Sequence, residues 1–218
     1  MDPLESSDAL VDAGILSVSD SAEIDLTEAY LDAVEQFRQR SRADRVAAIG
    51  ERDPDVARLV ESSAVDEGLI AHLCGVLEWF PDTPVDSLVL TAIVLQALDR
   101  GTPETAGVPV GFVPILGSQL ESVLQLYERV IVYVWREDCP PCDVVREDLE
   151  GLSPDQTEGI GQFAVYGPDC ARTLHREYDV VGGPALLFVA DGEVQSRLYG
   201  AEYPEVLSAE VEALQESG

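Results

Sequence analysis

Apolar residues in the first half of the chain recur at helical spacing. The pattern is clearest from Thr27 to Phe37, and Thr27 stands where it can cap the amino terminus of that helix. Similar periodicity occurs at positions 56–60, 69–77 and 88–98. Four or five short helices are therefore expected, with a weaker indication of a strand near 15–18. We predict a small all-helical domain here, and no motif in it indicates a role.

The pattern changes after residues 101–109, where glycine, proline and threonine accumulate. Such residues form turns and interrupt regular elements, so this stretch indicates a linker. Beyond it, helical patterns alternate with short apolar runs, which predicts an α/β fold. The expected helices are 118–128, 140–150, 170–178 and 202–215, and the expected strands are 130–135, 163–166, 185–190 and 194–199. We therefore predict two domains, 1–105 and 106–218.

The clearest candidate for chemistry is the sequence Asp-Cys-Pro-Pro-Cys at positions 138–142. It follows the apolar strand that ends at Trp135, so its first thiol, Cys139, lies where a helix begins. The unsatisfied N–H groups and partial positive charge of a helix amino terminus stabilise a thiolate. Cys142 is spaced to close a small disulfide with Cys139. The spacing and its strand-to-helix context favour a redox pair.

Metal binding is the alternative for these cysteines. With Cys139 and Cys142, the pair His72 and Cys74 would complete a tetrahedral zinc set. However, two positions along a helix point His72 and Cys74 in different directions, so no metal is expected. Cys74 fits a buried apolar helix position, and Cys170 fits either an inert thiol or a third redox-sensitive one.

Charge narrows the range of partners. The 218 residues include 42 acidic and 13 basic ones, all 13 of them arginine, for a net charge of −29. The acidic excess is spread over both halves, unlike an acidic tail. Repulsion of this kind is screened within about 3 Å at about 1 M salt, so the surface is typical of a halophile. Nucleic acid, a polyanion, is not an expected partner.

The sequence also indicates a cytoplasmic protein without a membrane segment. The first residues, Met-Asp-Pro-Leu-Glu, have neither the basic nor the apolar region of a secretory leader. The longest apolar stretch, 85–98, is interrupted by Asp86 and Gln96 and is shorter than the roughly 20 residues that span a bilayer. In a reducing compartment, a close cysteine pair is more typical of catalysis or metal binding than of a disulfide scaffold.

Landmarks in the expected order make residues 118–215 resemble the thioredoxin family. The strand that runs into the Cys-Pro-Pro-Cys motif comes first. Residues 181–189, Val-Gly-Gly-Pro-Ala-Leu-Leu-Phe-Val, are similar to the cis-proline loop and central strand of that family. Asp-Gly-Glu-Val at 191–194, with Gly200, resembles its hairpin turn and late glycine. The resemblance implies a thioredoxin-like fold, a central mixed sheet flanked by helices, after the helical domain.

The resemblance also implies roles for the motif. Cys139 would be the nucleophile that attacks a substrate disulfide, and Cys142 would resolve the mixed disulfide. Pro140 takes the place of the usual glycine, and Pro141 would help to start the helix. The implied activity is that of a protein disulfide oxidoreductase with no bound cofactor, which receives electrons from a thioredoxin reductase or another donor.

Residues outside the motif would support it. By the resemblance, Pro184 would be the cis-proline packed against the cysteines, and Gly183 would present its backbone to a bound peptide. Trp135 would lie below the active site, and Asp169 could accept the hydrogen bond of its indole N–H. These residues complete the predicted site.

The chain also departs from the family pattern. Tyr133 replaces a buried aspartate, Val165 replaces a lysine, and Asp138 replaces the tryptophan before the first cysteine. The usual buried proton relay is therefore missing. This supports the alternative function, a thioredoxin-fold module that binds a protein partner and carries a structural or vestigial cysteine pair.

Overall fold

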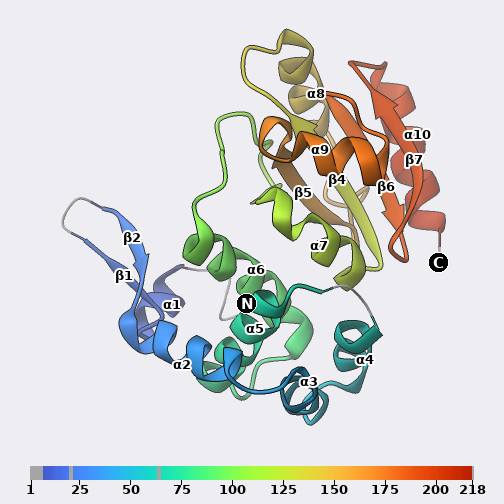
Figure 1. The fold of residues 1–218 in the computed structure, drawn as a ribbon. Coiled ribbons are helices and arrows are strands. Elements are labelled where there is room, and N and C mark those ends of the chain that lie inside the picture. The colour runs from blue at the N-terminus through green and yellow to red at the C-terminus, as the bar shows by residue number, and fades with distance from the viewer. Residues whose placement is uncertain (1–6, 20–21, 63–64, 218) are drawn as a thin grey trace. The chain divides into compact units, whose positions relative to one another are not determined.

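A computed structural model describes residues 7–19, 22–62 and 65–217 (Figure 1). The chain divides into two compact units, Met1–Thr102 (unit 1) and Pro103–Gly218 (unit 2). The division falls inside the stretch 101–109 that the sequence indicates as a linker. Residues 1–6, which carry the argument against a secretory leader, lie outside the described residues.

Unit 1 is built mainly from helices, as the apolar periodicity predicts. Its helices are α1 (Ser7–Asp12), α2 (Glu28–Arg38), α3 (Arg42–Gly50), α4 (Pro54–Ser62), α5 (Glu67–Trp79) and α6 (Val85–Arg100). The Thr27 hydroxyl caps α2 by accepting a hydrogen bond from the Tyr30 N–H at 3.3 Å. Helix α3 was not expected from the sequence, because only Arg45 and Ile49 of it are buried and its apolar pattern is correspondingly weak.

Unit 1 also contains a short antiparallel hairpin, so it is not purely helical. Strands β1 (Leu16–Val18) and β2 (Ile24–Leu26) form a two-stranded sheet. Of β1 only Leu16 is buried. A three-residue strand with one buried side chain gives little alternation in the sequence, which explains the weak indication at 15–18.

Unit 2 has the thioredoxin-like fold that the sequence predicts. Its strands are β3 (Val113–Ile115), β4 (Arg129–Trp135), β5 (Gly161–Tyr166), β6 (Ala185–Ala190) and β7 (Glu193–Tyr199). Its helices are η1 (Gly117–Gln119), α7 (Leu120–Leu126), α8 (Pro140–Glu150), α9 (Gly167–Tyr178) and α10 (Pro204–Glu216). The strand order is β3-β5-β4-β6-β7, with β3, β5 and β4 parallel and β6 and β7 antiparallel to their neighbours. Figure 1 shows helices on both faces of this mixed sheet.

The central strand β4 organises the core of unit 2. Successive side chains of a strand point to opposite faces. The side chains of Ile131, Tyr133 and Trp135 lie in one core with residues of α8 and α10, among them Val145 and Val211. The antiparallel partner β6 begins beside the carboxyl end of β4, where Val134 is opposite Ala185. The segment that follows β4 and the segment that precedes β6 therefore lie at the same end of the sheet.

Within the described residues, no helix is both long enough and apolar enough to cross a membrane.

Candidate functional site

The two motif cysteines lie at the amino terminus of α8. Cys139 is the N-cap residue, and its Sγ accepts a hydrogen bond from the Cys142 N–H at 3.3 Å. Pro140 and Pro141 fill the first helical positions, where a missing N–H costs no helical hydrogen bond. The two sulfurs form a disulfide, and Cys139 and Cys142 are only 6% and 4% exposed. The site is therefore a disulfide at the amino terminus of a helix.

The loop before β6 lies against this disulfide. The Gly183–Pro184 peptide bond is cis, which is the geometry the resemblance implies, and the Gly183 carbonyl oxygen is 3.9 Å from the Cys139 Sγ. A Cβ at position 183 would lie 3.1 Å from the Val134 carbonyl oxygen and 3.3 Å from the Trp135 backbone. The close approach of the two backbone segments therefore favours glycine at position 183. It leaves a backbone carbonyl beside the first sulfur.

Trp135 packs beneath the disulfide, without the polar partner that the resemblance implies. The indole packs at a tilt on Tyr166, with ring centroids 5.0 Å apart. Its Nε1 is buried and has no hydrogen-bond partner among the residues that the structure describes. The expectation that Asp169 accepts this N–H is wrong, because Asp169 lies exposed in the first turn of α9.

Gly107 forms the wall behind the indole. A Cβ at this position would lie 2.2 Å from the Trp135 ring, so the chain at Gly107 passes directly against the indole. In the sequence Gly107 is recognisable only as part of a linker, because a glycine among turn-forming residues gives no indication of close packing.

Tyr133 takes a structural role at the position where the family has an aspartate. Its hydroxyl donates a hydrogen bond to the Cys142 carbonyl oxygen at 2.8 Å. Burial raises the pKa of Tyr133 well above its usual value, although the nearby Arg146 opposes the shift. Val165, at the lysine position, is buried in β5. Tyr133 is therefore a neutral donor that joins α8 to the sheet, and no carboxylate stands at position 133.

Two hollows flank the disulfide. A cavity of about 680 Å³ is lined by the chain at Gly107, the end of β4 and the first turns of α8, including both cysteines, Asp143 and Arg146. A smaller, mostly apolar hollow of about 170 Å³ lies beside the cis-proline loop. Val181 lines the smaller one and is 79% exposed. The larger has a mixed polar and apolar lining and borders the two cysteines. The smaller is mostly apolar and borders the Gly183 backbone.

Arg146 was not singled out by sequence. It stands four residues after Cys142 on α8, a spacing that places two side chains on one face of a helix. Its guanidinium lies 3.4 Å from the Asp143 carboxylate. In the sequence, only this spacing indicates that Arg146 lies near Cys142.

The other cysteines are buried single thiols. Burial raises the pKa of Cys74 to about 12 and that of Cys170 to about 11. The Cys74 Sγ lies 3.7 Å from the Arg45 carbonyl oxygen, and the Cys170 Sγ lies 3.6 Å from that of Tyr166. Burial therefore favours the protonated form of both thiols.

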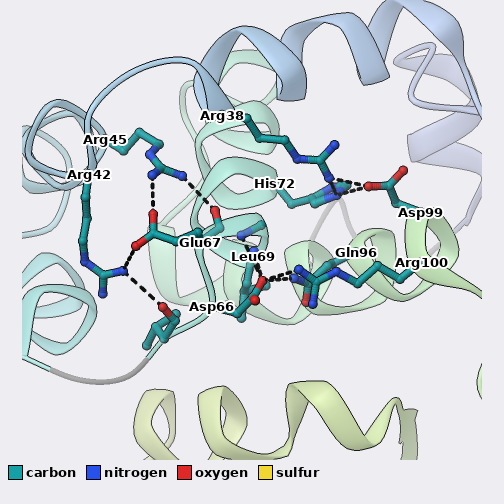
Figure 2. A network of polar contacts seen from close by, with 12 residues as sticks. Arg38, Arg42, Arg45, Asp66, Glu67, Leu69, His72, Gln96, Asp99 and Arg100 are labelled. Atoms are coloured by element: carbon teal, nitrogen blue, oxygen red, sulfur yellow. Dashed lines mark hydrogen bonds and ion pairs between the residues drawn. The ribbon is translucent and has the colours of Figure 1, made fainter.

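His72 belongs to a polar network inside unit 1. Figure 2 shows its ring beside Asp99 and Arg38, and its Nε2 is 3.2 Å from the Asp99 carboxylate. Its Nδ1 is 3.1 Å from the Tyr30 hydroxyl. Burial lowers the pKa of His72 to about 4, against the opposing effect of Asp99. Among the described residues there is no group of three or more His, Cys, Asp and Glu side chains placed to hold a metal ion.

Comparison with known proteins gave structural matches only. No protein-family model and no curated protein matches the chain. The solved structures that match include a single-site mutant of a thioredoxin from Halobacterium salinarum NRC-1, at 22% identity and a TM-score of 0.42, over 53% of this chain and 97% of that one. Mitochondrial thioredoxin 3 of Saccharomyces cerevisiae, in its oxidized form, matches at 14% identity and a TM-score of 0.41, over 47% and 94%. A thioredoxin of Malassezia sympodialis matches at 22% identity and a TM-score of 0.40, over 46% and 88%.

Proposed function

We propose that unit 2 is a thiol-disulfide oxidoreductase that acts on protein disulfides in a reducing cytoplasm, with Cys139 as nucleophile and Cys142 as resolving thiol. One observation carries the proposal. The Cys139 sulfur caps α8, accepts the Cys142 N–H at 3.3 Å and faces the Gly183 carbonyl oxygen at 3.9 Å. The N–H groups of a helix terminus stabilise a thiolate at this position.

The reaction moves two electrons from the enzyme dithiol to the substrate. The Cys139 thiolate attacks one sulfur of the substrate disulfide, which breaks and releases its other sulfur as a thiolate. The Cys142 thiolate then attacks the Cys139 sulfur, forms the Cys139–Cys142 disulfide and releases the second substrate thiolate. Solvent supplies the protons that the released thiolates take up. An external dithiol donor, such as a thioredoxin reductase, restores the reduced pair, and no bound cofactor is needed.

The surroundings of the pair suit an extended peptide as substrate. The Gly183 backbone lies at the disulfide, and the apolar hollow with Val181 at its rim lies beside it. A partly exposed glycine backbone next to an apolar hollow fits the backbone and one side chain of a peptide. Pro184 and Trp135 would hold this surface in place.

A second candidate is a protein-binding module with a structural disulfide. The burial of both sulfurs and the neutral Tyr133 hydroxyl at the Cys142 carbonyl favour it. A buried pair without a base exchanges slowly and serves to fix the first turn of α8.

Trapping of the mixed disulfide separates the two functions. In molar salt, the reduced full chain with Cys142→Ser should form a covalent complex with insulin that has its disulfides intact. The complex persists because the serine cannot resolve the mixed disulfide. Cys139→Ser should form none, and Cys170→Ser should behave as the unchanged chain. Non-reducing electrophoresis and mass spectrometry of the linked peptides provide the measurement. Equal trapping by both motif variants, or by neither, would refute the assignment of Cys139 as nucleophile.

A further inference from the structure

Resolution of the mixed disulfide needs a thiolate at Cys142, and that residue is only 4% exposed. Burial favours the neutral thiol, which does not attack disulfides. Tyr133 on β4 contacts Cys142, but its hydroxyl donates a hydrogen bond to the Cys142 carbonyl oxygen and is neutral. Another group must therefore favour the charged form of Cys142.

Arg146 is placed to do this. It lies one helical turn after Cys142 on α8, and both side chains line the cavity of about 680 Å³. The Arg146 Nε is buried and has no hydrogen-bond partner within the described part of the chain. The charge of Arg146 also lowers the pKa of the Tyr133 hydroxyl against the effect of burial, so its field reaches the group bonded to Cys142.

We propose that Arg146 is a positioning residue for the resolving step, in which its guanidinium stabilises the thiolate of Cys142 across the cavity. The proposal rests on the function assigned above. The proton that Cys142 loses passes to solvent through the cavity, and the thiolate then attacks the Cys139 sulfur and displaces the substrate thiolate. A fixed cation that stabilises the thiolate thus takes the place of a buried base that would remove the proton.

The remaining charged groups along the cavity set the size of the effect. Asp143, Glu137 and Asp138 oppose the thiolate, whereas Arg136 favours it, as does the amino terminus of α8. Asp143 pairs with Arg146, but its side chain is 66% exposed and that of Arg146 is 32% exposed. Salt screens the more exposed charge more strongly. The effect of Arg146 should therefore persist in molar salt, where that of Asp143 weakens.

The pKa of Cys142 tests the proposal directly. In the full chain with Cys139→Ser, alkylation of Cys142 by iodoacetamide is followed against pH by peptide mass spectrometry. Adding Arg146→Gln should raise the pKa of Cys142 by about half to one unit and slow alkylation at pH 7 by roughly three- to tenfold. Arg146→Lys keeps the charge and should restore most of the reactivity. Arg176→Gln, on the exposed side of α9, is the matched control and should change nothing.

A variant that should shift the pKa of Cys142 in the opposite direction distinguishes an effect of charge from misfolding. Asp143→Asn removes the opposing charge and should lower the pKa of Cys142, most clearly in dilute buffer. The proposal is overturned if Arg146→Gln leaves the pKa unchanged, if Arg146→Lys titrates like Arg146→Gln, or if Asp143→Asn raises the pKa. None of these readouts depends on turnover. A failed insulin trap with a shifted Cys142 pKa would therefore count against the oxidoreductase alone, and a working trap with no shift against Arg146 alone.

Discussion

The two units use arginine in different ways. In unit 1 several cations bind acids from other elements: Arg38 pairs with Asp99 at 2.5 Å, and both Arg42 and Arg45 pair with Glu67 (Figure 2). Unit 1 also has local pairs, as in Arg58 with Asp55. Among the described residues of unit 2, the ion pairs join near neighbours instead, as in Arg146 with Asp143. Pairs that join elements hold a fold together, whereas local pairs add little to it. The ion pair of Arg146 therefore contributes little to the fold of unit 2.

Asp66 joins several polar groups of unit 1. One carboxylate oxygen caps α5 by accepting the N–H groups of Gly68 and Leu69 at 2.9 and 3.1 Å. The same oxygen accepts from Gln96 at 2.6 Å and from Arg100 at 2.7 Å, both on α6. The hydrogen bonds with Arg100 and Leu69 lower the pKa of Asp66 despite the opposing effect of burial. A residue in this position stabilises the helix pair.

The largest expected effect that distinguishes the two units is a loss of stability of unit 1 in mild acid. The pKa of His72 is about 4 in the folded chain and about 6.5 when unfolded, so between these values the unfolded state binds the extra proton. Stability is therefore complete above about pH 6.5 and falls by about 2 to 3 kcal/mol as the pH approaches 4. Below pH 4, His72 adds no further loss.

Denaturant unfolding at several pH values measures this loss. Trp135→Phe leaves Trp79 as the sole tryptophan, so its fluorescence reports on unit 1. His72→Gln should remove the slope between pH 6.5 and 4, and the exposed His175→Gln should retain it. A His72→Gln variant with an unchanged slope would show that other groups cause the acid sensitivity.

Breaking an ion pair that joins elements should cost less, but still measurably. Glu67→Ala leaves Arg45, which is nearly fully buried, without its carboxylate partner. Because Glu67 itself is 56% exposed, we expect a loss of about 1 to 2 kcal/mol in the free energy of unfolding. Asp143→Ala removes a local pair in unit 2 and should stay within about 0.5 kcal/mol of the unchanged chain. Equal losses would remove the distinction between the two kinds of pair.

The smallest expected effect concerns salt and Cys139. The exposed acids Glu137, Asp138 and Asp143 oppose a Cys139 thiolate, while the hydrogen bonds at the α8 terminus favour it. Salt screens the exposed acids more than the short hydrogen bonds, so the pKa of Cys139 should fall by a few tenths of a unit, roughly, between dilute and molar salt. Iodoacetamide titration of the reduced chain measures it, with Cys139 more reactive than a model thiol. Faster reaction at Cys142 would contradict the prediction.

Local patterns predicted most of unit 2 from sequence because its elements bury long apolar runs. Helix α8 and strand β6 begin and end where the sequence indicates, since proline starts the helix and a continuous apolar run forms the strand. Strand β3 was missed because it has three residues with Pro114 in the middle, which suits only a short edge strand.

For the site, the sequence predicted the groups that form a motif but not those that only pack near it. The cysteine motif and the Gly-Gly-Pro loop are contiguous and can be recognised in one dimension. The contact between Gly107 and Trp135 and the shared cavity of Arg146 and Cys142 depend on tertiary packing. Asp169 was assigned a hydrogen bond by resemblance alone, and its exposed position in α9 shows why alignment of a residue does not fix where its side chain lies.

Gly107 has a practical consequence for where unit 2 can be cut out of the chain. The recognisable resemblance starts at residue 118, so a fragment designed from it would begin after the glycine that covers the indole. Such a fragment would keep both thiols and the cis-proline loop, yet its Trp135 ring would open to solvent beneath the disulfide. A fragment that starts at Pro103 keeps the ring covered. Unit 2 therefore extends further toward the amino terminus than its recognisable motifs.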